Sequence, residues 1–232
     1  MWQANLHAQS SADFEKNNMV LGRYFSPDIK NEIEETGLNF SEYIPKNLNV
    51  AVLFTDIVGF TKLSEKMEPN DVLQLLSEYQ TIMVECIFEF NGTVDKFIGD
   101  AVMANFGTPK SYGNDAQNAF DCAKKMKLML HEWNKNRIGN KQKVIQHRIG
   151  IHYGECVVGN VGGEKRVEYT VLGDTVNVAS RLCDLSKNFD NDLLISKTFY
   201  NQIEIVDDYE VFQSQTIKGR KEKLDLIRVF LN

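Results

Sequence analysis

Several features that mark other classes of protein are missing from this sequence. Its 232 residues include four cysteines, none in a C-x-x-C pair, which disfavours a zinc knuckle or a thioredoxin-type site. No apolar run approaches the ~20 residues that cross a bilayer, and the N-terminal residues lack the basic start and apolar centre of a signal peptide. We therefore expect a cytoplasmic chain with buried free thiols and no direct membrane insertion.

A surplus of positive charge is also missing. Lys and Arg number 26 against 32 Asp and Glu, which disfavours a nucleic-acid partner, because such proteins usually carry a basic surface. An anionic substrate would need local positive charge or a metal ion against this background. The glycine-rich stretch "GNVGGEKR" is neither G-x-G-x-x-G nor a Walker A loop, and it fits a hairpin turn that carries Lys165 and Arg166.

The chain divides into two parts by its residue pattern. Residues 1–47 are polar and mixed, and we interpret them as an N-terminal linker or arm, whereas residues 48–232 form the main domain. Within the first part, the tripeptide Ser-Pro-Asp predicts a helix that begins at Pro27 and is ended by Gly37.

Hydrophobic spacing in the main domain predicts strands and helices in the order β-α-β-β-α-β. The predicted elements are a strand over 50–56, a helix from Pro69 to Asn91, a hairpin over 94–106, a helix from Asn114 or Asp115, and a strand over 143–161. A third helix over 173–186, a strand, a short helix and a closing hairpin follow. This order is similar to a ferredoxin-like α+β core, in which helices cover one face of an antiparallel sheet, with additional C-terminal strands.

Two aspartates are embedded in apolar segments of this core. Asp56 ends the first strand and Asp100 lies at the tip of the next hairpin, so the two tips can converge. Carboxylates that meet repel each other unless a cation lies between them, and oxygen ligands of this kind suit Mg²⁺ or Mn²⁺. Exposed backbone amides in the segment that follows Asp56 could hold phosphate oxygens. For either aspartate alone, a cap or a turn residue is the competing interpretation.

Other polar residues are candidates on weaker grounds. Strand alternation places Lys96 on the face of Asp100, where it could contact a substrate, although an exposed strand lysine is the simpler interpretation. Asn177 and Arg181, four residues apart, share a helix face that could anchor ribose and phosphate or could merely be solvated. His152 lies in an apolar strand without an evident partner, and we predict a structural histidine.

Three blocks of the sequence resemble a known family. "FTDIVGFTKLSE", "VDKFIGDAVMANFG" and "EYTVLGDTVNVASRL" look like the signature blocks of class III adenylate/guanylate cyclase catalytic domains, in the right order and spacing over about residues 48–232. The resemblance implies the class III nucleotide cyclase fold and a homodimer with composite active sites. It also implies that ATP is converted to 3′,5′-cyclic AMP and pyrophosphate with two Mg²⁺ or Mn²⁺ ions per site.

The resemblance also implies roles for single residues. The metal ligands would be Asp56, Ile57 and Asp100. The backbone that cradles the phosphates would be that of Ile57, Gly59, Phe60 and Thr61. From the other subunit, Lys96 and Thr170 would read the adenine, and Asn177 and Arg181 would stabilise the transition state. The triphosphate would be bound by Lys218, with Lys165 or Arg166 as a second cation.

Thr170 departs from the commonest patterns of this family. Many adenylate cyclases have Asp there, and guanylate cyclases typically have Cys there with Glu in place of Lys96. The pair Lys96 and Thr170 resembles the subgroup with Thr, in which bicarbonate stimulation is described. Lys96 can donate to adenine N1 and Thr170 can serve the exocyclic amine, but a threonine hydroxyl can also donate to guanine O6, so a guanylate or dual-specificity cyclase is the alternative.

The remaining alternatives are another two-metal enzyme and a catalytically inactive module, and the N-terminal segment bears on regulation. A diguanylate cyclase or a polymerase palm would need another signature, such as G-G-D-E-F, which is absent. A catalytically inactive dimerisation or sensor module would be signalled by loss of a metal-binding Asp, and both are present. The segment "LGRYFSPDIKNEIEE" resembles the connector that follows a sensor domain in microbial cyclases, which implies an upstream regulatory domain.

Overall fold

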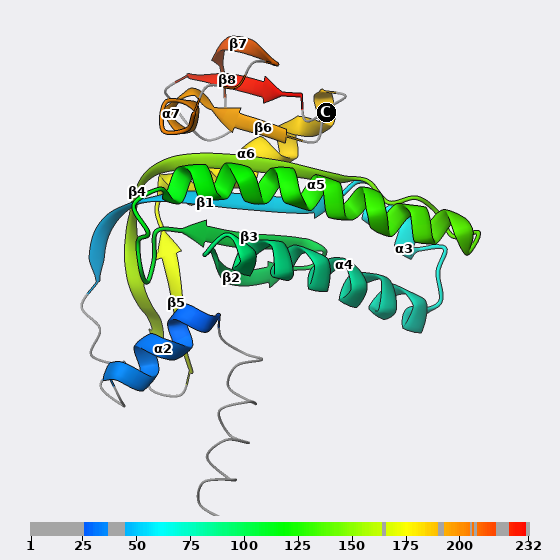
Figure 1. The fold of residues 1–232 in the computed structure, drawn as a ribbon, viewed down its shortest axis with the longest axis horizontal. Helices are drawn as coiled ribbons and strands as arrows, with labels where there is room; N and C mark the ends of the chain where they lie inside the picture. The colour runs from blue at the N-terminus through cyan, green and yellow to red at the C-terminus, as the bar shows by residue number, and fades with distance from the viewer. Residues whose placement is uncertain are drawn as a thin grey trace, which may run out of the picture.

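An antiparallel sheet, as the strand pattern predicts, lies at the centre of the fold (Figure 1). The computed structural model describes residues 26–36, 45–163, 166–189, 193–204, 206, 208–216 and 223–230. The four core strands are β1 (Lys46–Ile57), β2 (Thr93–Ile98), β3 (Ala101–Phe106) and β4 (His147–Gly163). They lie in the order β2-β3-β1-β4 with antiparallel neighbours, which is the ferredoxin-like arrangement.

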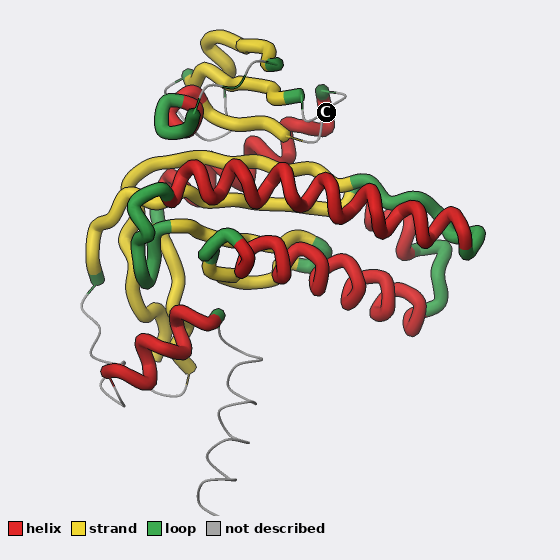
Figure 2. Tube along the Cα trace, viewed as in Figure 1, coloured by secondary structure: helices red, strands yellow, loops and turns green. Residues whose placement is uncertain are grey.

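The sheet continues beyond this core on the side of β4. β6 (Leu193–Ser196) pairs with β4 in parallel, and β8 (Leu224–Val229) and β7 (Tyr209–Gln215) follow it as the predicted closing hairpin. β5 (Arg166–Leu172) pairs with the second half of β4. Figure 2 shows β4 and β5 continuing as a two-stranded ribbon past the rest of the sheet.

Two long helices cover one face of the sheet. α4 (Pro69–Glu89) and α5 (Asp115–Gly139) lie side by side, with α4 over β2 and β3 and α5 over β1 and β3 (Figure 1). Because successive strand residues point to opposite faces, Ala51, Leu53 and Ile57 of β1 enter the cluster under these helices. Burying each large aliphatic side chain of this kind contributes about 1.5–3 kcal/mol, so the main core lies here.

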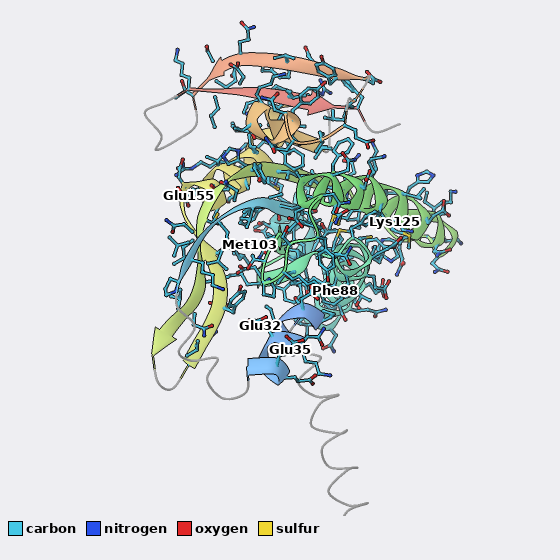
Figure 3. The ribbon with its side chains drawn as sticks, turned by 60° about the vertical axis from the view of Figure 1, so that its left-hand side comes forward. Glu32, Glu35, Phe88, Met103, Lys125 and Glu155 are labelled. Carbon is cyan, nitrogen blue, oxygen red and sulfur yellow. The ribbon has the colours of Figure 1, made fainter. Side chains whose placement is uncertain are left out.

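The opposite face of the sheet is covered as well, by α6 (Asp174–Leu185) and α2 (Pro27–Thr36). Val50, Val52 and Phe54 of β1 point to this side, where Ile29 of α2 joins the same apolar cluster. Figure 3 shows α2, marked by Glu32 and Glu35, beneath the strand that carries Met103. The sequence predicted helices on one face; the alternate residues of β1 are apolar too, so the second face also needs cover.

Element boundaries differ from the predictions by a few residues. The strand predicted over 50–56 is β1, which is longer at both ends, and the strand predicted over 143–161 is β4, which begins later at His147. The predicted stop of the first long helix is present, since Asn91 has a left-handed φ of 57°. The short elements are α3 (Phe60–Ser64), a 3₁₀ turn (Ser186–Asn188) and α7 (Lys197–Tyr200).

Two expectations about composition can be compared with the structure. All four cysteines are buried free thiols, as predicted. No helix among the residues described above is long and apolar enough to cross a bilayer.

Candidate active site

The two aspartates singled out from the sequence meet at one end of β1. Asp56 occupies the penultimate position of the strand, and Asp100 lies in the turn between β2 and β3. Asp100 Oδ2 accepts a hydrogen bond from the Ile57 amide at 3.1 Å. Burial, a hydrogen bond with Asp56 and the charge of Asp56 raise the pKa of Asp100 to about 7. The carboxyl groups therefore face each other closely enough to compete for one proton.

This donor set fits a hard divalent cation. Two carboxylates that raise each other's energy when ionised are relieved by a shared positive charge, and oxygen donors of this kind are the ligands of Mg²⁺ and Mn²⁺. Over the described parts of the chain, no cluster of three or more His, Cys, Asp or Glu side chains offers an alternative metal site. The geometry thus gives Asp56 and Asp100 as candidate ligands, and the family resemblance adds the backbone of Ile57.

Arg148 is a member of this site that the sequence interpretation missed. It lies directly across from Asp56 in the pairing of β1 with β4, and its Nη2 donates to Asp56 Oδ2 at 2.5 Å. Both side chains are mostly shielded from solvent. An arginine in the apolar stretch "HRIGIH" was a signal, because a buried guanidinium needs a carboxylate partner.

The segment after Asp56 begins a short helix. Gly59 has a left-handed φ of 69° and precedes α3, and its carbonyl accepts from Leu63 N. The amides of Ile57 and Val58 donate to Asp100 Oδ2 and to Gln146 O, so they are already used. The amides left for phosphate oxygens by the start of the helix are those of Gly59, Phe60 and Thr61.

Lys96 and Thr170 form a second group, with Asp95 between them. Thr170 Oγ1 donates to Asp95 Oδ1 and Oδ2 at 2.8 and 2.9 Å. Lys96 Nζ lies 3.5 Å from Asp95 Oδ1 and 2.9 Å from Glu168 Oε2. The sequence interpretation named Lys96 and Thr170 but missed both acids.

A bulge in β2 explains why the side chains of the consecutive residues Asp95 and Lys96 both reach β5. The pairing of β2 with β3 skips one residue between Val94 and Lys96, which leaves Asp95 outside the ladder. A bulge of this kind re-aims side chains, so Asp95 and Lys96 both contact β5. The predicted strict alternation from Lys96 to Asp100 does not hold, because β2 ends at Ile98 and Asp100 belongs to the turn.

Asn177 and Arg181 lie on the outer side of α6, as their spacing predicted. The inner side buries Val178, Ala179 and Leu182 against the sheet. Neither Asn177 nor Arg181 makes a hydrogen bond or ion pair to any described residue. As far as the described part of the chain goes, both polar groups are therefore open to a ligand or a second chain.

The remaining predictions concern Arg166, Lys165, Lys218 and His152. Arg166 is exposed at the start of β5, opposite Gly163. Lys165 and Lys218 lie outside the described residues. His152, predicted to be structural and to lack a partner, does have one: its Nδ1 and Ser196 Oγ are 2.7 Å apart in the buried interior.

Among the described residues of one chain, no hydrogen bond or ion pair joins the two groups. Asp95 bonds Thr170, whereas Asp100 bonds Ile57. One group offers carboxylates for a cation, and the other offers an ammonium and a hydroxyl for a polar ligand.

Comparison with known proteins assigns the family. The family described as "Adenylate and Guanylate cyclase catalytic domain" matches residues 42–230. The chain belongs to this family. Solved structures of cyclase domains share the fold of this cyclase domain: the adenylyl cyclase CyaB from P. aeruginosa is 33% identical, with a TM-score of 0.70, over 81% of this chain and 96% of that one.

Two further relatives are similar to most of the cyclase domain. The guanylyl cyclase Cya2 is 32% identical, with a TM-score of 0.71, over 80% of this chain and 93% of that one. "Adenylate cyclase 1" of Rhizobium meliloti (strain 1021) is 32% identical over 217 residues, which are 86% of this chain and 33% of that protein. The chain spans about a third of the length of the curated relatives it matches.

Proposed function

We propose that this cyclase domain converts ATP to 3′,5′-cyclic AMP and pyrophosphate at two active sites shared by a homodimer. The observation that carries the proposal is the contact of Asp56 with Asp100 beside the Ile57 amide, while Lys96 and Thr170 form a separate group in the same chain. Two chains would bring the acids of one subunit to the base-reading pair of the other. Relatives named adenylate or adenylyl cyclase support ATP as the substrate.

The acids would hold the catalytic cations. Asp56, Asp100 and the backbone of Ile57 would bind two Mg²⁺ or Mn²⁺ ions, which supply activation of the ribose 3′-hydroxyl and neutralise triphosphate charge. The chain keeps the two carboxylates facing each other, since Arg148 and the Ile57 amide each bind one of their oxygens. No side chain is needed as an obligatory base.

The other residues would orient the nucleotide and stabilise developing charge. Amides of Gly59, Phe60 and Thr61 would bind phosphate oxygens, with Lys218 and either Lys165 or Arg166 on the triphosphate. Asn177 and Arg181 project from α6, where no described residue binds them, and they would meet charge that develops on the α-phosphate. Fixed donors of this kind are each worth about 3–4 kcal/mol of transition-state stabilisation.

Lys96 and Thr170 would read position 1 and position 6 of the base. The Lys96 ammonium would donate to adenine N1 once it leaves Glu168, and that exposed ion pair is worth only about 0–1 kcal/mol. A guanylate cyclase is the second candidate, because the guanylyl cyclase Cya2 is as similar in sequence as the adenylyl cyclase CyaB. The ratio of kcat/KM for ATP and for GTP discriminates the two.

Mixing two inactive variants tests the shared site. We expect Asp56→Ala and Asn177→Ala each to lose nearly all cyclic AMP production with ATP and Mn²⁺. Because the defects lie in different halves of the site, a 1:1 mixture allowed to exchange subunits should recover about a quarter of wild-type activity. The measurement is cyclic AMP formed per mole of chain before and after mixing.

The matched control pairs two defects in the same half. Asp56→Ala mixed with Asp100→Ala leaves both sites of every mixed dimer without a metal ligand, so no recovery is expected. Failure of Asp56→Ala and Asn177→Ala to recover, although mixed dimers are present by mass spectrometry, would reject the shared site. A wild-type chain that forms no cyclic nucleotide would reject the activity itself.

Three further predictions concern a response to bicarbonate, an upstream regulatory domain and a cytoplasmic location. The pair Lys96 and Thr170 favours a response to bicarbonate, and the N-terminal segment favours an upstream regulatory domain in a cytoplasmic protein. Each stays a prediction, and adding bicarbonate to the ATP assay checks the first.

A further inference from the structure

Asp95 is almost completely buried and is surrounded by donors. Its side chain is 1% exposed. Besides the Thr170 hydroxyl, the Val171 amide donates to Oδ2 at 3.2 Å, and the Lys96 ammonium lies 3.5 Å from Oδ1. Every group that contacts the carboxyl is therefore a donor, which matches an ionised carboxylate, since that form can only accept.

The contact with Asp95 determines what the Thr170 hydroxyl can offer to anything else. A threonine hydroxyl has one proton and two lone pairs, and its proton rotates to suit its partner. Both oxygens of Asp95 lie within 2.9 Å of Thr170 Oγ1, so that single proton points at the carboxylate. Only the lone pairs of Thr170 remain, and the oxygen can act only as an acceptor.

We propose that Asp95 is a specificity-determining positioning residue: by taking the Thr170 proton, it makes Thr170 accept from a 6-amino purine and reject a purine with an acceptor at position 6. The inference rests on the proposed function, and it decides between the two hydrogen-bonding roles that a threonine offers. Asp95 itself does not touch the base.

The donors around Asp95 favour its ionised form against the cost of burial. Burial raises the pKa of Asp95 above its ordinary value, and the Thr170 hydroxyl, Lys96 and the Val171 amide offset only part of that rise. Thr170 is 3% exposed, and Glu168, which shares its side of β5, holds Lys96 in an exposed ion pair. Such surface pairs contribute little to stability, so Lys96 can leave Glu168 when a base binds beside Thr170.

A matched pair of substrates tests the inference on the wild-type homodimer. N6-methyl-ATP and the triphosphate of 6-O-methylinosine have the same bulk and the same acceptor at N1, but position 6 carries N–H in one and an ether oxygen in the other. We expect kcat/KM to be at least tenfold higher for N6-methyl-ATP, because a buried acceptor facing another acceptor loses its hydrogen bond. Equal kcat/KM values, or a preference for the ether, would overturn the inference.

Substitution of Asp95 tests the cause of that preference. In Asp95→Asn the amide oxygen can still accept from the Val171 amide while Nδ2 donates to Thr170, which frees the threonine proton for the base. We expect the preference for N6-methyl-ATP to fall to within about threefold or to invert. Asp95→Ser, which removes the carboxylate without adding bulk, should change the ratio in the same direction.

Three controls separate this effect from loss of structure. Asp121→Asn makes the same change at a surface ion pair on α5 and should leave the ratio unchanged. In a Thr170→Val background, Asp95→Asn should alter the ratio less than twofold, because the hydroxyl it acts through is gone. Folding is checked by thermal unfolding; if neither Asp95 variant folds, the wild-type substrate pair decides.

Two failures are distinguishable. A wild-type chain that makes no cyclic nucleotide from ATP contradicts the proposed function. A working cyclase whose folded Asp95→Asn variant keeps the wild-type ratio contradicts only the role of Asp95.

Discussion

Among individual residues, Asp100 shows how the fold changes the titration of a side chain. Its carboxyl is half-buried against Asp56, and its pKa rises to about 7 from the ordinary 3.8, first by burial and then through Asp56. A raised pKa in the folded state means that folding favours the protonated form. The stability from this group is therefore fully present below pH 3.8 and is lost as the pH rises through about 7.

We expect this loss to be visible in the pH dependence of metal-free protein. With EDTA present, the free energy of unfolding of the wild type should fall between pH 5 and 8 relative to that of Asp100→Asn, whose side chain does not titrate. The measurement is urea unfolding of both proteins across that range. Asp121→Asn on α5 is the control, and it should follow the wild type.

Added Mn²⁺ should reverse the trend. A cation binds the ionised carboxylates, so binding must displace the proton of Asp100 below pH 7. The rise in Tm on adding Mn²⁺ should accordingly be larger at pH 8 than at pH 6, and absent in Asp100→Asn. A pH-independent rise would contradict the facing arrangement of the two acids.

Of the helices, α2 shows how the N-terminal part joins the catalytic body. Ser26 Oγ bonds both the amide and the carbonyl of Val94, at 3.0 and 3.2 Å, on the residue that precedes Asp95. The Tyr112 hydroxyl reaches Asp28, and Ile29 is 4% exposed in the cluster on the second face of the sheet. This helix is thus attached to the bulged part of β2 that aims Asp95 and Lys96.

The contribution of α2 to stability can be measured at Ile29. Truncating a buried isoleucine removes its apolar contacts and leaves a cavity, so Ile29→Ala should lower the free energy of unfolding by about 2 kcal/mol or more. Leu73→Ala on α4 is the matched control, because Leu73 is 66% exposed and should cost little. Indistinguishable urea unfolding curves for the two variants would show that α2 is not docked in solution.

Taken as a whole, the molecule exposes an apolar surface on the ribbon of β4 and β5, which we propose as a contact of the homodimer. On the ribbon of β4 and β5, Val157 and Leu172 lie directly across from each other and Val161 follows on the same side. All three are more than 40% exposed. Exposed apolar groups gathered in this way are typical of a surface that another protein covers.

A charge on this ribbon should weaken the homodimer. We expect Val157→Glu to lower cyclic AMP production per chain at least tenfold at dilute protein, and less at high protein concentration, because mass action restores the dimer. Val144→Glu is the control, since Val144 is equally exposed but lies outside the ribbon. Sedimentation velocity gives the association state, and an unchanged monomer–dimer equilibrium would contradict a dimer contact at Val157.

Local pattern was enough to find the elements and the two acids. The strand that ends at Asp56, the helix stop at Asn91 and the turn around Asp100 each follow from a few neighbouring residues. The partners of those residues were not predictable in the same way. Arg148 is 92 positions from Asp56, and only the register of β1 against β4 brings them together.

By itself, the sequence determined the order of strands and helices, the family, and which polar residues stand in apolar surroundings, because these follow from periodicity and from short blocks of residues. Only the tertiary structure decided which hydrogen bonds those residues make. The bulge at Asp95 shifts the β2 side chains by one position, and the hydroxyl of Thr170, 75 positions away, lies against that carboxylate. Such a contact depends on strand register, which is set by packing across the whole sheet rather than by neighbours in the chain.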